Sequence, residues 1–203
     1  MEQRHSDGVL MRGLGRWLVF SRPRAWLGMR VEVPRLLREV RIPLGAICLD
    51  LATGLGWANA GLARRAPSAK VVALDYDGTI LPRTRDYLSS HVAAASTAVC
   101  RADAKRLPFR HATFDLVLCL YGFHHCRGYL DALREAARVL KRDGTLALID
   151  SVRKSTKPPG GHHGTEVPTS EGLQRLLSEA GFRPVSPRVS MGRAKVVVHK
   201  ATS

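Results

Sequence analysis

The chain has 203 residues, of which 45% are hydrophobic and 24% are charged, as in an ordinary globular protein. No apolar run of about 18 residues occurs, which excludes a transmembrane helix. The four cysteines form no Cys-x-x-Cys pair and favour buried, reduced thiols in a cytoplasmic protein. Adjacent histidines, as in His124-His125 and His162-His163, rarely bind one ion, so we expect no metal site.

The net charge of +15 is concentrated in the two ends of the chain, residues 1–45 and 151–203. Such an excess indicates an anionic partner, namely nucleic acid, an anionic lipid surface or an acidic substrate. A bias toward arginine with no partner explains the charge equally well. Because Arg12, Arg16 and other arginines interrupt the N-terminal apolar residues, we expect no signal peptide and a cytoplasmic location.

Residues 1–45 predict two helices. In the first, apolar residues recur at helical spacing with arginines between them: Leu10, Leu14, Trp17 and Leu18. We expect Pro23 to end this helix and residues 32–40 to form the second. The segment is predicted to cover a cofactor cleft as a lid and to line the acceptor pocket. An anionic membrane surface is the alternative partner for its basic amphipathic face.

The most informative stretch is the apolar run 46–51 and the turn after it. The run contains Asp50 and is followed by Gly54, Gly56 and a helix. Glycine in such a turn can adopt positive φ and lets a ligand approach the backbone N–H groups. A dinucleotide fingerprint is disfavoured because its third position is Asn59, and a P-loop is disfavoured because no lysine follows Gly56. The remaining pattern, Asp-x-x-x-Gly-x-Gly, resembles motif I of the class I S-adenosylmethionine (SAM)-dependent methyltransferases.

Strands and helices alternate through the rest of residues 46–150. Helices are expected over residues 57–65, from Pro82 onward and over 129–141, and strands over 71–74, 97–101, 114–120 and 145–149. This alternation predicts an α/β protein with a Rossmann-like doubly wound sheet and helices on both faces. Ligands bind such sheets at the carboxyl ends of the strands, so residues directly after each strand are the candidates for a site.

The C-terminal part is predicted as a loop, a helix and a hairpin. Residues 153–168 are rich in Gly, Pro and His and are expected to form a substrate loop. A helix is expected over 170–180, capped by Thr169 or Ser170, and strands over 182–189 and 194–200. With this helix and hairpin (169–200), residues 46–203 are predicted to form the domain that binds the cofactor.

Two carboxylates follow predicted strands at positions suited to a nucleoside. Asp75 lies 21 residues after Gly54 and can accept both hydroxyls of a ribose. Asp103 can accept from the amino group of an adenine. The alternative role of both is to bond the backbone of their own turns.

Residues 100–109, 114–117, 124–125 and 133–146 extend the resemblance to the SAM-dependent methyltransferases of the ubiquinone/menaquinone-biosynthesis type. The similarity covers about residues 46–150. It implies a seven-stranded sheet with the last strand antiparallel, and SAM as cofactor. It also implies the cofactor-binding residues: Asp50, Ala52, Thr53, Gly54, Gly56, Asp75, Tyr76, Asp103, Ala104 and Tyr121. Where the family has Pro-Gly-Gly this chain has residues 142–144, Arg-Asp-Gly, and we expect a turn there.

Methyl transfer from a sulfonium depends mostly on proximity and alignment, but a hydroxyl or phenol acceptor also needs a base. His124 and His125 are the candidates, with Tyr121 facing the cofactor; their alternative role is to shape the pocket. We expect transfer to a small-molecule or lipid-like acceptor of the quinol or phenol type. An RNA methyltransferase that uses the basic flanks and a non-enzymatic SAM-binding protein are the alternatives. A lipid-like acceptor would make the cytoplasmic protein peripheral to a membrane.

Overall fold

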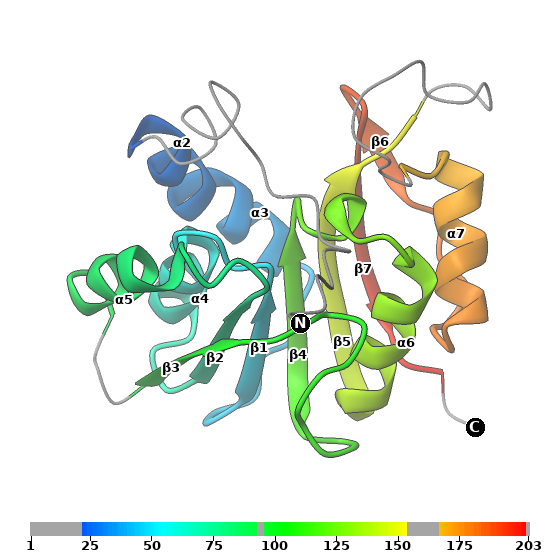
Figure 1. Ribbon diagram of the computed structural model, residues 1–203. Helices are drawn as coiled ribbons and strands as arrows, with labels where there is room; N and C mark the ends of the chain where they lie inside the picture. The colour runs from blue at the N-terminus through cyan, green and yellow to red at the C-terminus, as the bar shows by residue number, and fades with distance from the viewer. Residues whose placement is uncertain (1–21, 93–95, 154–166, 202–203) are drawn as a thin grey trace, which may run out of the picture.

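The computed structural model describes residues 22–92, 96–153 and 167–201. A seven-stranded sheet runs through it in the order β3-β2-β1-β4-β5-β7-β6 (Figure 1). The strands are β1 (Ile47–Leu51), β2 (Lys70–Asp75), β3 (Thr97–Arg101), β4 (Phe114–Leu120), β5 (Leu140–Ser151), β6 (Arg188–Ser190) and β7 (Arg193–His199). The helices are α2 (Arg22–Leu27), the π-helix η1 (Gly28–Glu32), α3 (Val33–Leu37), α4 (Trp57–Arg65), α5 (Leu81–Ser89), the 3₁₀ helix η3 (Phe123–His125), α6 (Tyr129–Val139) and α7 (Ser170–Glu179).

Strands β1 to β5 pair in parallel, whereas β7 is antiparallel to both β5 and β6. This confirms the predicted fold class, including the antiparallel last strand. Since parallel strands end at one edge, the residues after β1, β2, β3 and β4 lie along a common carboxyl edge of the sheet. The turn between β6 and β7 lies at this same edge, because Arg193 of β7 pairs with Ser151 at the end of β5.

Helices pack on both faces of the sheet, as expected from its buried strands. In Figure 1, α3, α4 and α5 gather on one side and α6 and α7 on the other. One core layer joins α6 and α7 to the sheet through Leu133, Leu173 and Leu177, which are fully buried. The other joins α3 and α4 to β1 and β4, with Leu36 and Leu62 fully buried.

The N-terminal helices differ from the prediction. A helical run extends over Arg22–Leu37 as α2, η1 and α3, so the helix expected over 32–40 begins earlier and ends earlier. Pro23 lies within α2, and the helix that it was expected to end lies outside the described residues. The amphipathic helix expected around Leu10 to Leu18 lies outside the described residues.

Two strand boundaries also differ. The turn expected at 142–144 lies within β5, which begins at Leu140, so α6 ends at Val139 rather than at residue 141. Residues 141–144 are accommodated by a register shift in the pairing of β5 with β4, in which Phe114 pairs with Leu140 but Leu116 pairs with Thr145. The strand expected over 182–189 is reduced to β6, because prolines at 184 and 187 have no N–H to donate to a neighbouring strand.

The N-cap of α7 is Thr169, one of the two residues predicted for it, and its side chain accepts from the N–H of Gly172.

Candidate functional site

The first part of the site is the turn between β1 and α4. Asp50, near the end of β1, is 1% exposed and accepts a hydrogen bond of 2.6 Å from the hydroxyl of Thr53. Burial raises the pKa of Asp50 to about 7. Gly54 and Gly56 both have positive φ, 54° and 86°, and Ala52 has φ 55°. Left-handed backbone of this kind favours glycine, most clearly at Gly56, where a Cβ would also lie 2.9 Å from the Leu88 side chain. The turn also holds a carboxyl group, that of Asp50, whose charge is sensitive to its surroundings near neutral pH.

Asp75, the last residue of β2, ties the neighbouring loops together. Its Oδ2 accepts from the N–H of Gly54 at 2.8 Å, and its Oδ1 accepts from the N–H of Asp77 at 2.9 Å. Burial raises the pKa of this carboxyl group. The backbone N–H of Tyr76 bonds this carboxylate as well. A carboxylate has about four lone-pair positions, so it can still accept from a ligand. The predicted Tyr76 follows directly, and its carbonyl oxygen accepts from Arg101 at 3.2 Å.

The loop after β3 contains the predicted Asp103 and Ala104. Asp103 Oδ1 accepts from the N–H of Lys105 at 2.9 Å, so this carboxylate does bond its own turn. The Asp103 side chain is nevertheless 37% exposed, and its Oδ2 lies 3.9 Å from the ammonium of Lys105. It keeps free lone pairs at the carboxyl edge of the sheet.

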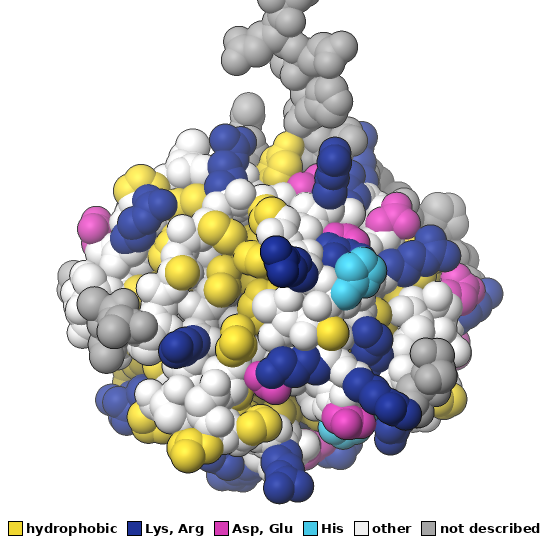
Figure 2. Space-filling view, turned by 90° about the horizontal axis from the view of Figure 1, so that it is seen from below, with side chains coloured by type: hydrophobic (Ala, Val, Ile, Leu, Met, Phe, Trp, Pro, Cys, Tyr) yellow, Lys and Arg dark blue, Asp and Glu magenta, His cyan; other side chains and the backbone are white. Residues whose placement is uncertain are grey.

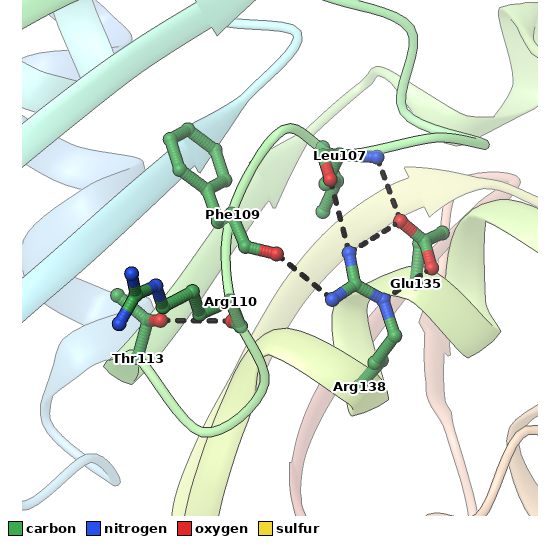
Figure 3. A network of polar contacts seen from close by, with 6 residues as sticks. All are labelled: Leu107, Phe109, Arg110, Thr113, Glu135 and Arg138. Atoms are coloured by element: carbon green, nitrogen blue, oxygen red, sulfur yellow. Dashed lines mark hydrogen bonds and ion pairs between the residues drawn. The ribbon is translucent and has the colours of Figure 1, made fainter.

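A half-buried arginine of α6 holds the continuation of this loop (Figure 3). Arg138 donates to the carbonyl oxygens of Phe109 at 2.8 Å and Leu107 at 3.0 Å, and pairs with Glu135. Glu135 Oε2 in turn accepts from the N–H of Leu107 at 2.7 Å. Charge-assisted bonds of this kind are stronger than neutral ones, so the loop that carries Asp103 is anchored to α6.

Tyr121, predicted to face the cofactor, follows β4 with a φ of 60°. Its hydroxyl donates to Glu32 of η1 at 3.0 Å and accepts from Arg193 of β7 at 3.3 Å. Arg193 also lies 3.6 Å from Glu32. Three separate segments, the N-terminal helices, the end of β4 and the start of β7, thus meet at the Tyr121 hydroxyl.

The two predicted histidines lie in η3, and the structure places one of them against a residue that the sequence reasoning missed. His124 contacts the buried carboxylate of Asp150, near the end of β5. Asp150 comes directly after an apolar run, as Asp75 does, so the same signal of a carboxylate after a strand would have identified it.

The arrangement fits a nucleoside cofactor. The Asp75 carboxylate is suited to a ribose diol and the glycine turn to close approach of a ligand, with Asp50 beneath it and Asp103 one strand beyond. Within the described ranges, no cluster of three or more His, Cys, Asp or Glu side chains is arranged to hold a metal ion. Nor does that part of the chain contain a helix long and apolar enough to cross a membrane.

Comparison with known proteins gives one family for this chain. A family model described as a methyltransferase domain matches residues 49–148. A demethylmenaquinone methyltransferase of Deinococcus radiodurans is 35% identical over 143 residues, 70% of this chain and 52% of the relative. The mitochondrial 2-methoxy-6-polyprenyl-1,4-benzoquinol methylase of Caenorhabditis elegans is 32% identical over 144 residues, 64% of this chain and 49% of the relative. The chain spans about half the length of these curated relatives.

Solved structures share the fold. A SAM-dependent methyltransferase from Aquifex aeolicus superimposes with a TM-score of 0.71 at 23% identity, covering 87% of this chain and 93% of that one. The [4+2]-cyclase SpnF superimposes with a TM-score of 0.68 at 22% identity, covering 75% of this chain and 57% of that one. The fold alone therefore does not fix the reaction.

Proposed function

Because this chain belongs to the methyltransferase domain family matched over residues 49–148, we propose that it is a SAM-dependent methyltransferase acting on a small molecule of the quinol or phenol type. When bound, SAM supplies a methyl group on a positively charged sulfur. The observation that carries the proposal is the Asp75 carboxylate, which is bonded to the N–H of Gly54 and can still accept a hydrogen bond from a ribose.

The cofactor roles follow from the order of the residues along the carboxyl edge. The turn from Asp50 to Gly56 would hold the methionine part, Asp75 the ribose, and Asp103 with Ala104 the adenine. Asp50 beneath the turn favours a cationic ligand once it is ionised, and both the amino group and the sulfonium of SAM are cationic. The Arg138–Glu135 pair would keep the adenine loop in place.

The acceptor class is supported by the relatives. The two described above are named for a demethylmenaquinone and for a benzoquinol, and both are quinone-type small molecules. We assign the acceptor side of the site to the N-terminal segment, residues 1–45, because Glu32 reaches Tyr121 at the end of β4. Most of the substrate loop predicted at residues 153–168 lies outside the described residues.

A lipid-like acceptor would bring the protein to an anionic membrane surface. Trp26 and Leu27 of α2 are 58% and 42% exposed, and Met191 at the carboxyl edge is 87% exposed. Aromatic and apolar side chains beside a basic chain are suited to the headgroup region. Sedimentation with vesicles of anionic and of neutral lipid tests this: binding to the anionic vesicles alone supports it, and no sedimentation with either argues against it.

An RNA acceptor is the second choice. Figure 2 shows Lys and Arg side chains scattered among acidic and apolar ones on the face seen there, rather than gathered in a stripe. Several basic residues are also paired with carboxylates, among them Arg188 with Glu39 at 2.9 Å and Lys141 with Asp115 at 2.8 Å. Charges neutralised in this way attract phosphates less.

The test uses SAM labelled on its methyl group. Purified protein is incubated with short-chain demethylmenaquinol, with short-chain 2-methoxybenzoquinol, with RNA, or with no acceptor. Label in either quinol supports the proposal, and label in RNA alone supports the second choice. Titration calorimetry with SAM is run in parallel, because cofactor binding without transfer to any acceptor would favour a non-enzymatic SAM-binding protein. The absence of SAM binding would refute the cofactor site itself.

A further inference from the structure

The carboxylate of Asp150 is the centre of a buried cluster beside the cofactor turn. The residue is 0% exposed, and both of its oxygens accept two hydrogen bonds. Oδ2 accepts from the N–H of His124 at 2.9 Å and from the hydroxyl of Tyr129 at 3.1 Å. Oδ1 accepts from the N–H of Ser151 at 2.8 Å and contacts Nδ1 of His124. Four donors from β5, η3 and α6 therefore converge on one carboxylate.

This arrangement sets the tautomer of His124. An ionised carboxylate can only accept, so the Nδ1 that contacts it carries the hydrogen. In the neutral ring, Nε2 then bears the lone pair and is the basic nitrogen. Among the described residues, no hydrogen bond to Nε2 is found, and the His124 side chain is 16% exposed. The ring is held at one end and has a free basic nitrogen at the other.

His125 is less suited to act as a base. Its Nδ1 is buried without a hydrogen-bond partner among the described residues. Burial first, and then the adjacent His124, lower the pKa of His125 to about 4. A ring with so low a pKa takes up protons poorly at neutral pH. Its centroid lies 3.9 Å from that of His124, so it forms a wall beside that ring.

The cluster borders the cofactor site. Gly122, the N-cap of η3, lies so close to the glycine turn that a Cβ there would be 2.5 Å from the Cβ of Ala52. The thiol of Cys126, which follows η3, has its pKa raised to about 12, by burial first and then by the charges of Asp103 and Asp150. The carboxylate near the adenine position and the carboxylate of the cluster thus both lie near Cys126.

We infer that His124 is the general base of the proposed methyl transfer and that Asp150 is the residue that positions it. This inference rests on the proposed function and narrows its substrate class to acceptors with a removable proton, such as a phenol or quinol hydroxyl. Nε2 of His124 takes the hydroxyl proton, and the electron pair released, on the oxygen or on the conjugated ring carbon, forms the new bond to the methyl carbon. Where the ring carbon forms the bond, that carbon then loses its own proton to water and the oxygen regains one, which restores the aromatic ring. The methyl–sulfur bond breaks with its electron pair going to sulfur. The imidazolium then passes its proton to water.

The first test reads the tautomer directly and needs no acceptor. Nitrogen NMR of histidine-labelled protein, with and without bound SAM, is assigned with His124→Asn and His125→Asn. We expect the His124 ring to carry its proton on Nδ1 in the wild type, and to lose this preference in Asp150→Asn, whose amide can also donate. A wild-type ring protonated on Nε2 would overturn the inference, whatever the variants do.

The second test measures methyl transfer to the short-chain quinols, with titration calorimetry of SAM on the same samples. We expect His124→Ala to lower kcat by about 10²–10⁴-fold with SAM affinity unchanged, and added imidazole to restore part of the activity. His111→Ala, an exposed histidine before β4, is the matched control and should keep wild-type kcat.

The outcomes separate this inference from the proposed function. If His124→Ala keeps wild-type kcat while the wild type methylates a quinol, the base assignment is wrong and the methyltransferase remains. If the wild type binds no SAM, the proposed function itself fails. Should Asp150→Asn not fold, Tyr129→Phe provides the second variant. It removes one donor from Asp150 but leaves the contact with Nδ1, so the His124 ring should keep its proton on Nδ1. Loss of that preference in Tyr129→Phe would show that the contact with Asp150 does not set the tautomer.

Discussion

Replacing Gly56 with alanine tests the glycine turn on which the proposed cofactor site depends. Gly56 is the N-cap of α4 and has a φ of 86°. A Cβ there would lie 2.9 Å from Cγ and Cδ2 of Leu88 on α5. Gly181, after α7, provides a matched control, since its φ is 88° but a Cβ there would meet nothing within 4 Å. The two substitutions share the backbone strain and differ in the steric contact.

The difference between the two variants gives the size of the effect. A Cβ in the left-handed region costs about 1–2 kcal/mol, and we expect this loss of unfolding free energy for Gly181→Ala. Overpacking against a buried side chain adds about 1–3 kcal/mol, so we expect Gly56→Ala to lose about 2–5 kcal/mol in total. Gly56→Ala should also weaken SAM binding, because the added methyl group displaces the turn, whereas Gly181→Ala should not.

Urea denaturation and titration calorimetry measure both quantities. The double variant Gly56→Ala/Leu88→Ala removes the steric contact and should cost less than the sum of its single changes, by an interaction energy of about 1 kcal/mol or more. If Gly56→Ala is no less stable than Gly181→Ala, or if the double variant is simply additive, the close approach of α5 to the turn is not what requires glycine at this position.

Three further predictions concern the carboxylates and the loop they border. Asp75→Asn should weaken SAM binding by about 10–100-fold, since one acceptor for the ribose is lost; the exposed Asp86→Asn is its control, and equal affinities would refute the ribose assignment. Because the pKa of Asp50 is raised from 3.8 to about 7, its neutral form stabilises the fold at low pH, and this stability is lost as the pH rises through about 7. We therefore expect the unfolding free energy of Asp50→Asn to change less between pH 3.8 and about 7 than that of the wild type, by at most on the order of 4 kcal/mol. The same dependence on pH in both proteins would contradict this. Arg138→Met should lower the unfolding free energy by about 1–3 kcal/mol and weaken SAM binding, because two carbonyl oxygens and a carboxylate lose their donor. The control is Arg134→Met, an exposed position on the same helix, which should change neither quantity. Equal effects of the two substitutions would show that the hydrogen bonds of Arg138 are not what holds the loop.

Local patterns were sufficient to predict the strands that carry the site. An apolar run followed by Asp50 and two glycines specifies a strand, a turn and a helix from neighbouring residues alone, and the structure confirms β1 and α4 there. The alternation of strands and helices likewise predicts the parallel sheet, because each unit must bury an apolar face against the next. The cofactor roles of the residues after these strands stay predictions.

Boundaries were predicted less well where tertiary contacts override local preference. The helical run Arg22–Leu37 continues through its π-helix because Gly28 lets the backbone lie against the ring of Trp57, where a Cβ would come within 2.3 Å. The strand β5 begins at Leu140 because Leu140 pairs with Phe114 across a register shift. Neither contact is visible in a single stretch of sequence.

The sequence by itself determined the fold class and which residues follow the strands, since both depend on periodicity and on the conformational freedom of glycine. Only the tertiary structure decided which of two adjacent histidines has a carboxylate beside it. Asp150 lies 26 residues after His124, and the two meet because β4 and β5 are neighbours in the sheet. The same holds for Tyr121, whose hydroxyl joins Glu32 to Arg193 across most of the chain. Side-chain contacts between distant segments depend on the order and register of the strands, which local composition does not encode.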